Sequence, residues 1–363
     1  MKVVSTKLNK HLYSRLKDYS DTENKPISDC LFEAVAMFVN QLEDVTTEPH
    51  RFTFIDLCAG IGGMRLAFEE HGGKCVFASE IDRYCQRTYY ENFGEFPRGD
   101  IRKINTEDIP EHDILLASPP CQPFSKAGIS KRNSLGIDTG FEDETSGTIF
   151  FDICRIIKTK RPKAILMENV KNLKYHDGGR TWEVIKHSLE DMDYEVYAEI
   201  INGKDIVPQN RERIFIVCFD KRRYDDASFD FDYVTSNDKK VLRDILEDDV
   251  SVKYTLSDKR WRYLQDYKEH IKEKKTGFGY SIADLDGITR TLTARYHIDG
   301  AEILISQDGN PRKLTPRECA RLQGFPDSFK IVVSDTQAYR QFGNAVIVPL
   351  VSAIAEKIVD KII

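Results

Sequence analysis

A short apolar run that ends in two prolines and a cysteine constrains this chain more than any other feature. Residues 113–117, Asp-Ile-Leu-Leu-Ala, are typical of a buried strand bounded by turn residues. The segment Ser118-Pro119-Pro120-Cys121 then places Cys121 at the carboxyl end of that strand, the edge at which open α/β sheets bind ligands. Because the prolines restrict the backbone, the thiol is held in place, as a nucleophile requires. The alternative is a buried structural cysteine, the commoner role of this residue type.

A glycine-rich turn joins another predicted strand, residues 52–57, to a predicted helix at residues 64–71. Gly60 and Gly62 let the backbone approach a ligand, and the helix amino terminus offers free N–H groups. The pattern therefore predicts a nucleotide-binding element. It lacks the GxGxxG spacing of dinucleotide folds, and a plain tight turn would also use glycine.

Carboxylates follow several of the predicted strands. Glu80 ends the strand predicted at residues 75–82, about twenty residues after the glycines, where such folds bind a ribose hydroxyl. Asp100 precedes the strand that leads to Cys121, and Glu168 follows a strand at residues 164–167. We expect these groups to share one crevice, with Glu168 as the acid/base partner of the thiol. The alternative is that each is an ordinary loop acid.

Two arginines stand between the last pair of predicted strands, residues 194–200 and 214–219. Arg211 and Arg213 are one residue apart, which puts both side chains on one face of a strand. Further helices are predicted at residues 148–158 and 314–324, and a last apolar helix opens within residues 339–346.

From residue 220 to residue 310 the periodicity weakens, which predicts a smaller, loop-rich domain. Its segments 277–280 and 289–297 mix glycine, hydroxyl, arginine and aromatic side chains, the residue types that read base edges and phosphates. The candidates for DNA contact are Arg290, Thr291, Arg295 and Tyr296. A surface β-ribbon is the alternative.

The first 49 residues have a different character. A short alternating segment, residues 4–8, precedes two predicted helices, residues 9–19 with Asn9 as a cap and residues 28–39 with Ser28 as a cap. This order resembles a ribbon-helix-helix module, whose strands pair between two chains and place their outward residues, here Val3, Ser5 and Lys7 by pattern, in a DNA groove. A helical hairpin that only packs on the main domain is the alternative, favoured by six Lys/Arg against eight Asp/Glu in residues 1–50.

Composition sets broad limits. A chain of 363 residues with 40% hydrophobic residues can bury a large core in two or three domains. We find no apolar run of membrane-spanning length and no secretory segment, and we expect a cytoplasmic protein. The eight cysteines form no CxxC pair and no His/Cys grouping, so neither a disulfide framework nor a metal site is predicted. The net charge of −6 means that any DNA contact must use local basic patches.

Taken in order, these segments resemble the DNA (cytosine-5)-methyltransferases of bacterial restriction–modification systems. The resemblance covers most of the chain from Phe52 onward, apart from the middle domain. The segments that carry it are Phe54 to Gly63, Pro119-Pro120-Cys121-Gln122, Glu168-Asn169-Val170, Gln209-Asn210-Arg211-Glu212-Arg213, Arg317 to Pro326 and Gln341-Phe342-Gly343-Asn344. Two departures are the long amino-terminal extension and the long loop after Cys121.

The resemblance implies an α/β fold: a Rossmann-like S-adenosylmethionine-dependent methyltransferase domain (residues 50–219 and 336–363), a target-recognition domain (220–335) and the ribbon-helix-helix-like module (1–49). It implies a thiolate of Cys121 that adds to carbon 6 of a flipped-out cytosine, Glu168 at nitrogen 3, Arg213 at the pyrimidine oxygen and an assisting Arg211. The implied contacts to S-adenosyl-L-methionine are Asp56, Gly60, Gly62, Glu80, Ile81, Asp100 and Asn344. Those to double-stranded DNA include Gln122 and Ser125, and Ser125 begins a loop, residues 125–147, that closes behind the base.

Other functions predict other sequence features. A Rossmann oxidoreductase would need GxGxxG, and an inactive DNA-binding relative would lack the cysteine or the acid. An RNA substrate is also an alternative, although the sizeable segment before Leu314 favours DNA. Residues 277–305 look like recognition domains that read short CC…GG sites. We further expect a companion restriction endonuclease, and a homodimer through residues 1–49 that represses its own operon.

Overall fold

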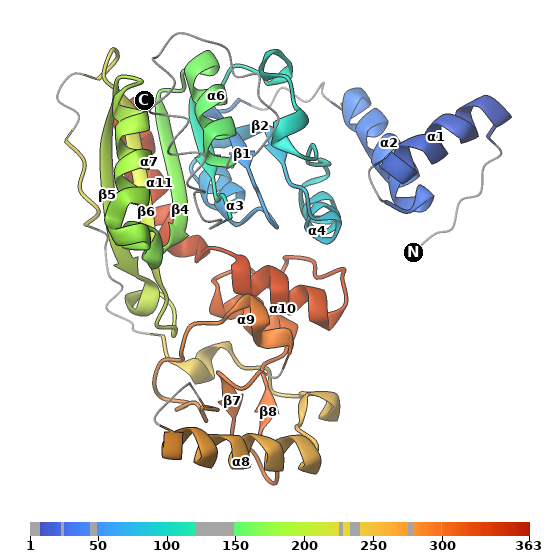
Figure 1. The fold of residues 1–363 in the computed structure, drawn as a ribbon, viewed down its shortest axis with the longest axis vertical. Helices are drawn as coiled ribbons and strands as arrows, with labels where there is room; N and C mark the ends of the chain where they lie inside the picture. Colours follow the sequence, from blue (N-terminus) through green and yellow to red (C-terminus); the bar gives the residue numbers. More distant parts are fainter. Residues whose placement is uncertain are drawn as a thin grey trace.

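A six-stranded sheet forms the centre of the computed structural model, which describes residues 8–22, 25–43, 49–120, 149–224, 228–232, 240–274, 279–298 and 300–363 (Figure 1). The strand order is β2-β1-β3-β4-β6-β5. Strands β1 to β4 are parallel, whereas β6 runs antiparallel to both of its neighbours. The strands are β1 (Phe52–Leu57), β2 (Gly73–Ser79), β3 (Ile114–Ala117), β4 (Ala164–Val170), β5 (Tyr194–Asn202) and β6 (Glu212–Asp220).

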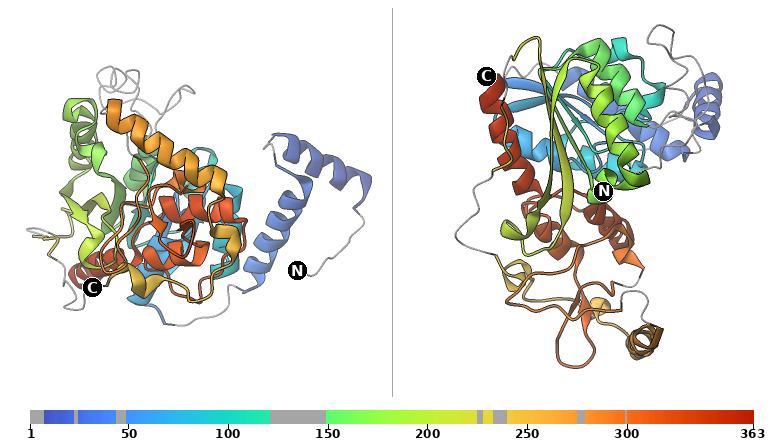
Figure 2. Two further views of the ribbon diagram at one scale, coloured as in Figure 1. Left: turned by 90° about the horizontal axis from the view of Figure 1, so that it is seen from below. Right: turned by 60° about the vertical axis from the view of Figure 1, so that its left-hand side comes forward.

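The central strands are buried on both faces, which is why they read as continuous apolar runs. Residues at even positions of β3 and β4, such as Leu116 and Leu166, join one core with α3 and α11. Their neighbours Leu115 and Ile165 join the opposite core with α6 and α7. This three-layer α/β arrangement confirms the predicted fold class (Figure 2).

Helices flank the sheet, and those predicted at residues 64–71 and 148–158 begin within one residue of their predicted starts. Helix α4 is capped by Asp82, whose side chain accepts from the backbone N–H groups of Tyr84 and Cys85. The flanking elements are α3 (Gly63–Glu70), α4 (Arg83–Phe93), α6 (Ile149–Lys160), α7 (Arg180–Glu190) and α11 (Val348–Ile362), with the short 3-10 helices η1 (Ile101–Lys103), η2 (Thr106–Asp108), η3 (Lys171–Lys174), η4 (His176–Gly179) and η5 (Gly203–Asp205).

A second lobe lies below the sheet in Figure 1 and contains more regular structure than its weak periodicity predicted. Its elements are η6 (Leu242–Ile245), η7 (Val252–Tyr254), α8 (Asp258–Lys274), η8 (Ala294–His297), β7 (Leu304–Ile305), β8 (Arg312–Lys313), α9 (Pro316–Leu322) and α10 (Asp335–Asn344). Helix α10 packs on η8 and α9. The expected domain boundary at residue 336 falls inside α10, so we propose to move it to the break at residues 345–347.

The end of the chain differs from its predicted form. Residues 339–346 do not open the last helix; they contain the end of α10, and the apolar helix α11 begins only at Val348 after a break. Within the described part of the chain, the stretch Asp335–Ile362 contains an 18-residue window whose mean hydropathy, 1.6, is high enough for a membrane span, but 61% of that window is buried inside the protein. Burial of this kind is typical of a core helix, and Pro349 fits the first turn of α11.

The two amino-terminal helices, α1 (Lys10–Thr22) and α2 (Ile27–Glu43), extend from one side of the body (Figure 1). Asn9 caps α1 as predicted, since its side chain accepts from the N–H of Leu12 at 2.8 Å. Ser28 is not the cap of α2, because that helix already begins at Ile27. The predicted strand at residues 4–8 lies outside the described residues except for Leu8, which is not in a strand.

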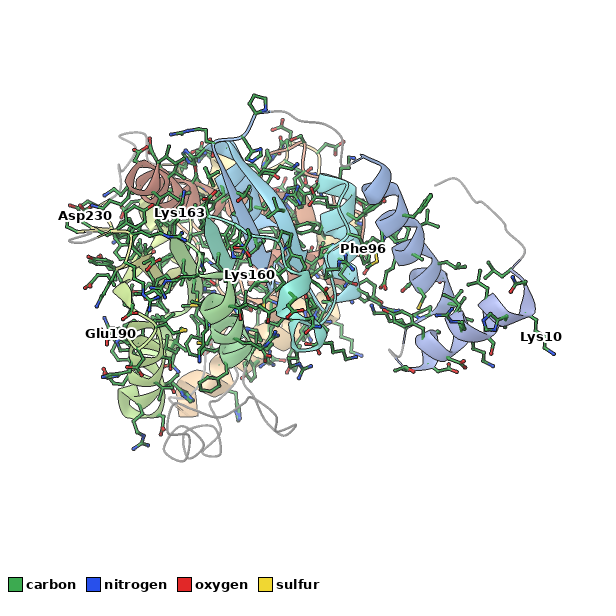
Figure 3. All side chains as sticks on the ribbon, turned by 90° about the horizontal axis from the view of Figure 1, so that it is seen from above. Lys10, Phe96, Lys160, Lys163, Glu190 and Asp230 are labelled. Atoms are coloured by element: carbon green, nitrogen blue, oxygen red, sulfur yellow. The ribbon has the colours of Figure 1, made fainter. Side chains whose placement is uncertain are left out.

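Helix α2 docks on α4 through an aromatic cluster. The Phe32 ring packs edge-on against Tyr90 and Phe96, with ring centroids 5.0 and 5.8 Å apart. Figure 3 shows Phe96 on the side of the body that faces the amino-terminal helices, while Lys10 lies at their far end. An ion pair between Asp29 and Arg83 at 3.3 Å adds to this contact. The module therefore rests on the helix that follows Glu80.

Candidate active site

A single cavity of about 490 Å³ lies at the carboxyl ends of β1 to β4. This is the edge at which α/β sheets bind ligands. It gathers the carboxylates predicted from strand ends, Glu80, Asp100 and Glu168, together with Gly60 of the glycine turn. The cavity is also lined by residues that the resemblance implied, Asp56, Ile81, Arg213 and Asn344, and by Pro119 and Pro120.

The glycine turn forms one wall of the cavity. Gly60 has a left-handed backbone (φ 56°), and a β-carbon built on it would meet no atom within 4 Å, so its outer side is open space. Gly62, also left-handed (φ 83°), precedes α3, and a β-carbon there would lie 2.2 Å from the Phe93 ring. Only glycine fits at this second position, which explains the tight turn.

Asp56 is a buried carboxyl group at the end of β1 that faces the cavity. It is 1% exposed, and its Oδ2 has no hydrogen-bond partner among the described residues. Burial raises the pKa of Asp56 to about 8, and the nearby Arg65 opposes this rise. A buried acceptor without a partner is costly, so this atom is suited to a ligand that donates a hydrogen bond or carries positive charge.

Glu80 and Asp100 are both fixed by local contacts. Glu80 accepts from the backbone N–H of Gly60 at 2.7 Å and from that of Asp82 at 2.8 Å, and burial raises its pKa. Hydrogen bonds from Arg102 lower the pKa of Asp100. Ile81 is 60% exposed at the cavity rim. Two acidic side chains and one apolar side chain thus converge on one space.

Glu168 and Arg213 form an ion pair deeper in the cavity. Both side chains project from the same face of neighbouring strands β4 and β6, in diagonal positions. Arg213 Nε lies 3.1 Å from Glu168 Oε1, but its N–H is not aligned for a hydrogen bond, and that oxygen has no other partner among the described residues. Burial raises the pKa of Glu168, and the charges of Arg213 and Arg211 oppose the rise. The carboxyl group can therefore accept or donate a proton toward a ligand.

Cys121, Gln122 and Ser125 lie outside the described residues, as does the rest of the 125–147 loop. The residues just before them are held by Asn169, whose side-chain Nδ2 donates to the carbonyl oxygen of Pro119 at 3.0 Å. Asn169 Oδ1 also accepts from the N–H of Val170. The sequence pattern assigned no role to Asn169, although its position beside a predicted acid at a strand end was a signal that could have revealed one.

Arg211, expected to assist catalysis, is not among the residues that line the cavity within the described chain. Its side chain is 1% exposed and donates to the carbonyl oxygens of Leu292, Gly343 and Ala345 at 2.9, 3.1 and 2.8 Å. Burial lowers the pKa of Arg211 to about 9. The Arg211 side chain therefore contacts residues of the cavity wall without itself lining the cavity.

The expected DNA-reading residues divide into two kinds. Arg290 and Arg295 are exposed on the second lobe. Tyr296 is fully buried, and its hydroxyl donates to the carbonyl of Ile303 and accepts from the N–H of Leu314, so Tyr296 is a core residue and not a DNA-reading one. The Thr291 hydroxyl donates to the carbonyl of Asn210 at 2.6 Å.

Comparison with known proteins identifies a family for this chain. Residues 52–360 match the C-5 cytosine-specific DNA methylase family. The type II methyltransferase M.DsaV of Dactylococcopsis salina is 50% identical over 318 residues, which cover 87% of this chain and 88% of the relative. The type II methyltransferase M.SsoII of Shigella sonnei is 48% identical over 360 residues, covering 97% and 92%.

Solved structures share the fold at lower identity. The Dnmt2 methyltransferase of S. pombe is 21% identical, with a TM-score of 0.65 over 84% of this chain and 97% of that one. The Entamoeba histolytica methyltransferase EhMeth is 20% identical, with a TM-score of 0.67 over 86% and 99%. The structural matches support the fold, and the sequence matches decide the assignment. The chain is a DNA (cytosine-5-)-methyltransferase and belongs to the C-5 cytosine-specific DNA methylase family, of the bacterial restriction–modification type.

Proposed function

We propose that the protein methylates carbon 5 of a cytosine that has been flipped out of a specific double-stranded DNA site, through a covalent adduct with Cys121. The observation that carries this proposal is the ion pair of Glu168 and Arg213 within the cavity that Pro119 and Pro120 border. It puts an acid and a cation beside the chain segment that leads to the thiol.

We propose that the same cavity binds S-adenosyl-L-methionine, and the residues present fit that molecule. The unpartnered Oδ2 of Asp56 suits a cationic or donating group, and the open side of Gly60 gives room for one. Glu80 is assigned to the ribose hydroxyls, Ile81 to the adenine face and Asp100 to the adenine amino group, and Asn344 completes the wall. Gly62 does not line the cavity in the described part of the chain, and we assign it to the tight turn that positions Gly60. When bound, the cofactor supplies the methyl group.

The residues of the base-binding side have separate roles. The Cys121 thiolate adds to carbon 6 of the cytosine, which makes carbon 5 nucleophilic. Glu168 holds a proton at nitrogen 3, for which its raised pKa is suited, and Arg213 contacts the pyrimidine oxygen. After methyl transfer, a general base, a side chain or a water, takes the proton from carbon 5. The carbon 5–carbon 6 double bond then re-forms as the carbon 6–sulfur bond breaks and the thiolate leaves.

This chemistry requires an extrahelical base, because neither face of a stacked cytosine admits a thiol. We assign Gln122 and Ser125 to contacts with the DNA as the 125–147 loop closes, and Arg290 and Arg295 to the groove. Net charge does not attract a polyanion to this chain, so such local cations matter.

Transfer of labelled methyl groups to DNA tests the reaction. We expect incorporation into duplex DNA and none with Cys121→Ser. Label that appears in tRNA and not in DNA would exclude the DNA function. Loss of label from DNA in which the target cytosines are replaced would show that those cytosines receive the methyl group.

The target site and biological setting are further proposals. We propose a CC…GG recognition site, a companion restriction endonuclease that cuts it, and a cytoplasmic location. Bisulfite sequencing of DNA from expressing cells reads the site directly, and methylcytosine outside a CC…GG context would contradict it.

We also propose that residues 1–49 pair two chains and bind an operator upstream of the gene. The match to M.SsoII covers 97% of this chain and therefore extends into the amino-terminal helices, beyond the family match that begins at residue 52. Leu12, Tyr13, Val35 and Phe38 expose between 48% and 60% of their surface, which is typical of an interaction face.

A further inference from the structure

The buried guanidinium group of Arg211 connects three segments that are distant in sequence. Its Nη1 donates to Leu292 of the second lobe, and its Nη2 donates to both Gly343 and Ala345 at the end of α10. Gly343 and Ala345, with Asn344 between them, line the cavity. Arg211 itself directly precedes β6, which carries Arg213. One residue therefore links the second lobe and the cavity wall to the strand that carries Arg213.

The contacts around Arg211 leave little freedom for movement. Asn210 donates its N–H to Thr289, and Thr289 returns one to Pro208, which pairs the two segments. Gln209 is fully buried and accepts the N–H of Leu292 at 2.9 Å. We call these segments, residues 208–211, 289–294 and 342–345, the lobe junction.

Close backbone packing limits the same place independently. A β-carbon on Gly343 would lie 2.4 Å from the carbonyl carbon and oxygen of Thr293. Backbone atoms do not yield as the end of a side chain does, so α10 and the 289–294 segment fit only with glycine here. The cavity wall at residues 343–345 is thus fixed to the 289–294 segment.

We propose that Arg211 is a positioning residue for the methylation reaction: by holding the carbonyl groups of the lobe junction, it sets the cofactor-side wall at residues 343–345 relative to Arg213 and Glu168. The inference rests on the proposed function of the cavity. It assigns to Arg211 no contact with the base.

The chemistry of the site requires arginine. The guanidinium offers donors in a rigid planar fork and so serves three carbonyl groups at once, whereas a lysine ammonium on a flexible stem cannot match those directions. No carboxylate pairs with Arg211 in the part of the chain that the structure describes. The three carbonyl groups therefore hold the Arg211 guanidinium group by hydrogen bonds. Replacing Arg211 by lysine keeps the positive charge but changes the directions of these bonds, so it disturbs the lobe junction directly.

Arg211→Lys tests this inference, with Arg222→Lys as the matched control, because Arg222 is 65% exposed and pairs with Asp193 at the surface. We measure S-adenosyl-L-homocysteine binding by calorimetry and hydrogen exchange of the ligand-free protein. Arg211→Lys should weaken binding by about tenfold or more. It should also speed exchange in peptides containing Leu292 and Ala345, and leave exchange in β1 and β3 unchanged.

Other results would overturn or support the positioning role. Unchanged affinity with unchanged exchange in Arg211→Lys would overturn the inference, and so would a variant that does not fold, since Arg211 would then serve overall stability. Restoration of affinity in Arg211→Ala by millimolar methylguanidinium would support it. If the parent protein itself does not bind S-adenosyl-L-homocysteine, the proposed cofactor function fails. If the parent binds it and Arg211→Lys binds it equally well with unchanged exchange, only the positioning role is refuted.

Discussion

Arg213 Nε lies 3.1 Å from Glu168 Oε1, and both side chains project from the same face of adjacent antiparallel strands. The pair is buried, so its two charges interact strongly while the cost of desolvation still raises the pKa of the carboxyl group. An acid of raised pKa beside a fixed cation suits the proposed addition of a thiolate to cytosine, because the pair can stabilise the charge that develops at nitrogen 3 and at the pyrimidine oxygen.

Glu168→Gln should lower the methylation rate by at least about 100-fold, the usual contribution of a positioned acid, because the amide cannot transfer a proton. Cofactor affinity should change little. Steady-state kinetics on a duplex substrate measures the effect, and a near-normal rate would mean that another carboxylate does this work. Glu212→Gln, which removes a half-exposed partner of Lys171, is the control.

Asn169→Ala should reduce the maximal rate more than it weakens cofactor binding. The change removes the hydrogen bond to the Pro119 carbonyl, which fixes the backbone two residues before Cys121. We expect a loss of about tenfold, consistent with one hydrogen bond of ~1.4 kcal/mol. Equal effects on the rate and on cofactor binding would place the role of Asn169 in general stability.

The stability of the ligand-free protein should fall as pH rises because of Asp56. Its folded-state pKa, about 8, is above its ordinary value of 3.8, so the folded state binds the proton more tightly than the unfolded state. This contribution is complete below about pH 4 and is lost as pH rises through about 8. Arg65 opposes the shift, while Glu80 and Glu69 increase it.

Asp56→Asn should therefore flatten the fall in Tm between pH 6 and pH 8.5, roughly the upper part of that window. Asp113→Asn serves as the control, since the pKa of Asp113 is lowered in the folded state. Parallel melting curves for the parent and Asp56→Asn across this range would argue against a protonated Asp56.

Deletion of residues 2–49 should leave methylation largely intact, because the family match begins at residue 52. It should convert a dimer to a monomer in light scattering and abolish binding to the upstream promoter in a gel shift. A full-length protein that is monomeric at micromolar concentration would contradict the dimer, and promoter binding that survives Ser5→Ala with Lys7→Ala would contradict the operator contact.

Sequence patterns located the sheet and the cavity because both follow from local signals. The strands are apolar runs buried on two faces, and ligand groups stand at their carboxyl ends, so Glu80, Asp100 and Glu168 could be named from the pattern alone, whereas Asp56 came only from the family resemblance. The α/β prediction rested on the same signals.

Long-range contacts explain most of what the patterns did not reveal. Tyr296 looked like a DNA-reading aromatic because nothing local shows that Ile303 and Leu314 enclose its hydroxyl. Arg211 and Arg213 look equivalent in sequence, yet residues more than eighty positions away decide that one is buried in the lobe junction. The break before α11 was also missed, since the apolar pattern continues across it.

The most direct test is mass spectrometry of nucleosides from duplex DNA incubated with the purified protein and S-adenosyl-L-methionine. The account predicts 5-methylcytosine from the parent protein, none from Cys121→Ser, and a stable protein–DNA adduct when the target cytosine is replaced by 5-fluorocytosine. Methylation at the exocyclic nitrogen, or 5-methylcytosine formed equally well by Cys121→Ser, would contradict it.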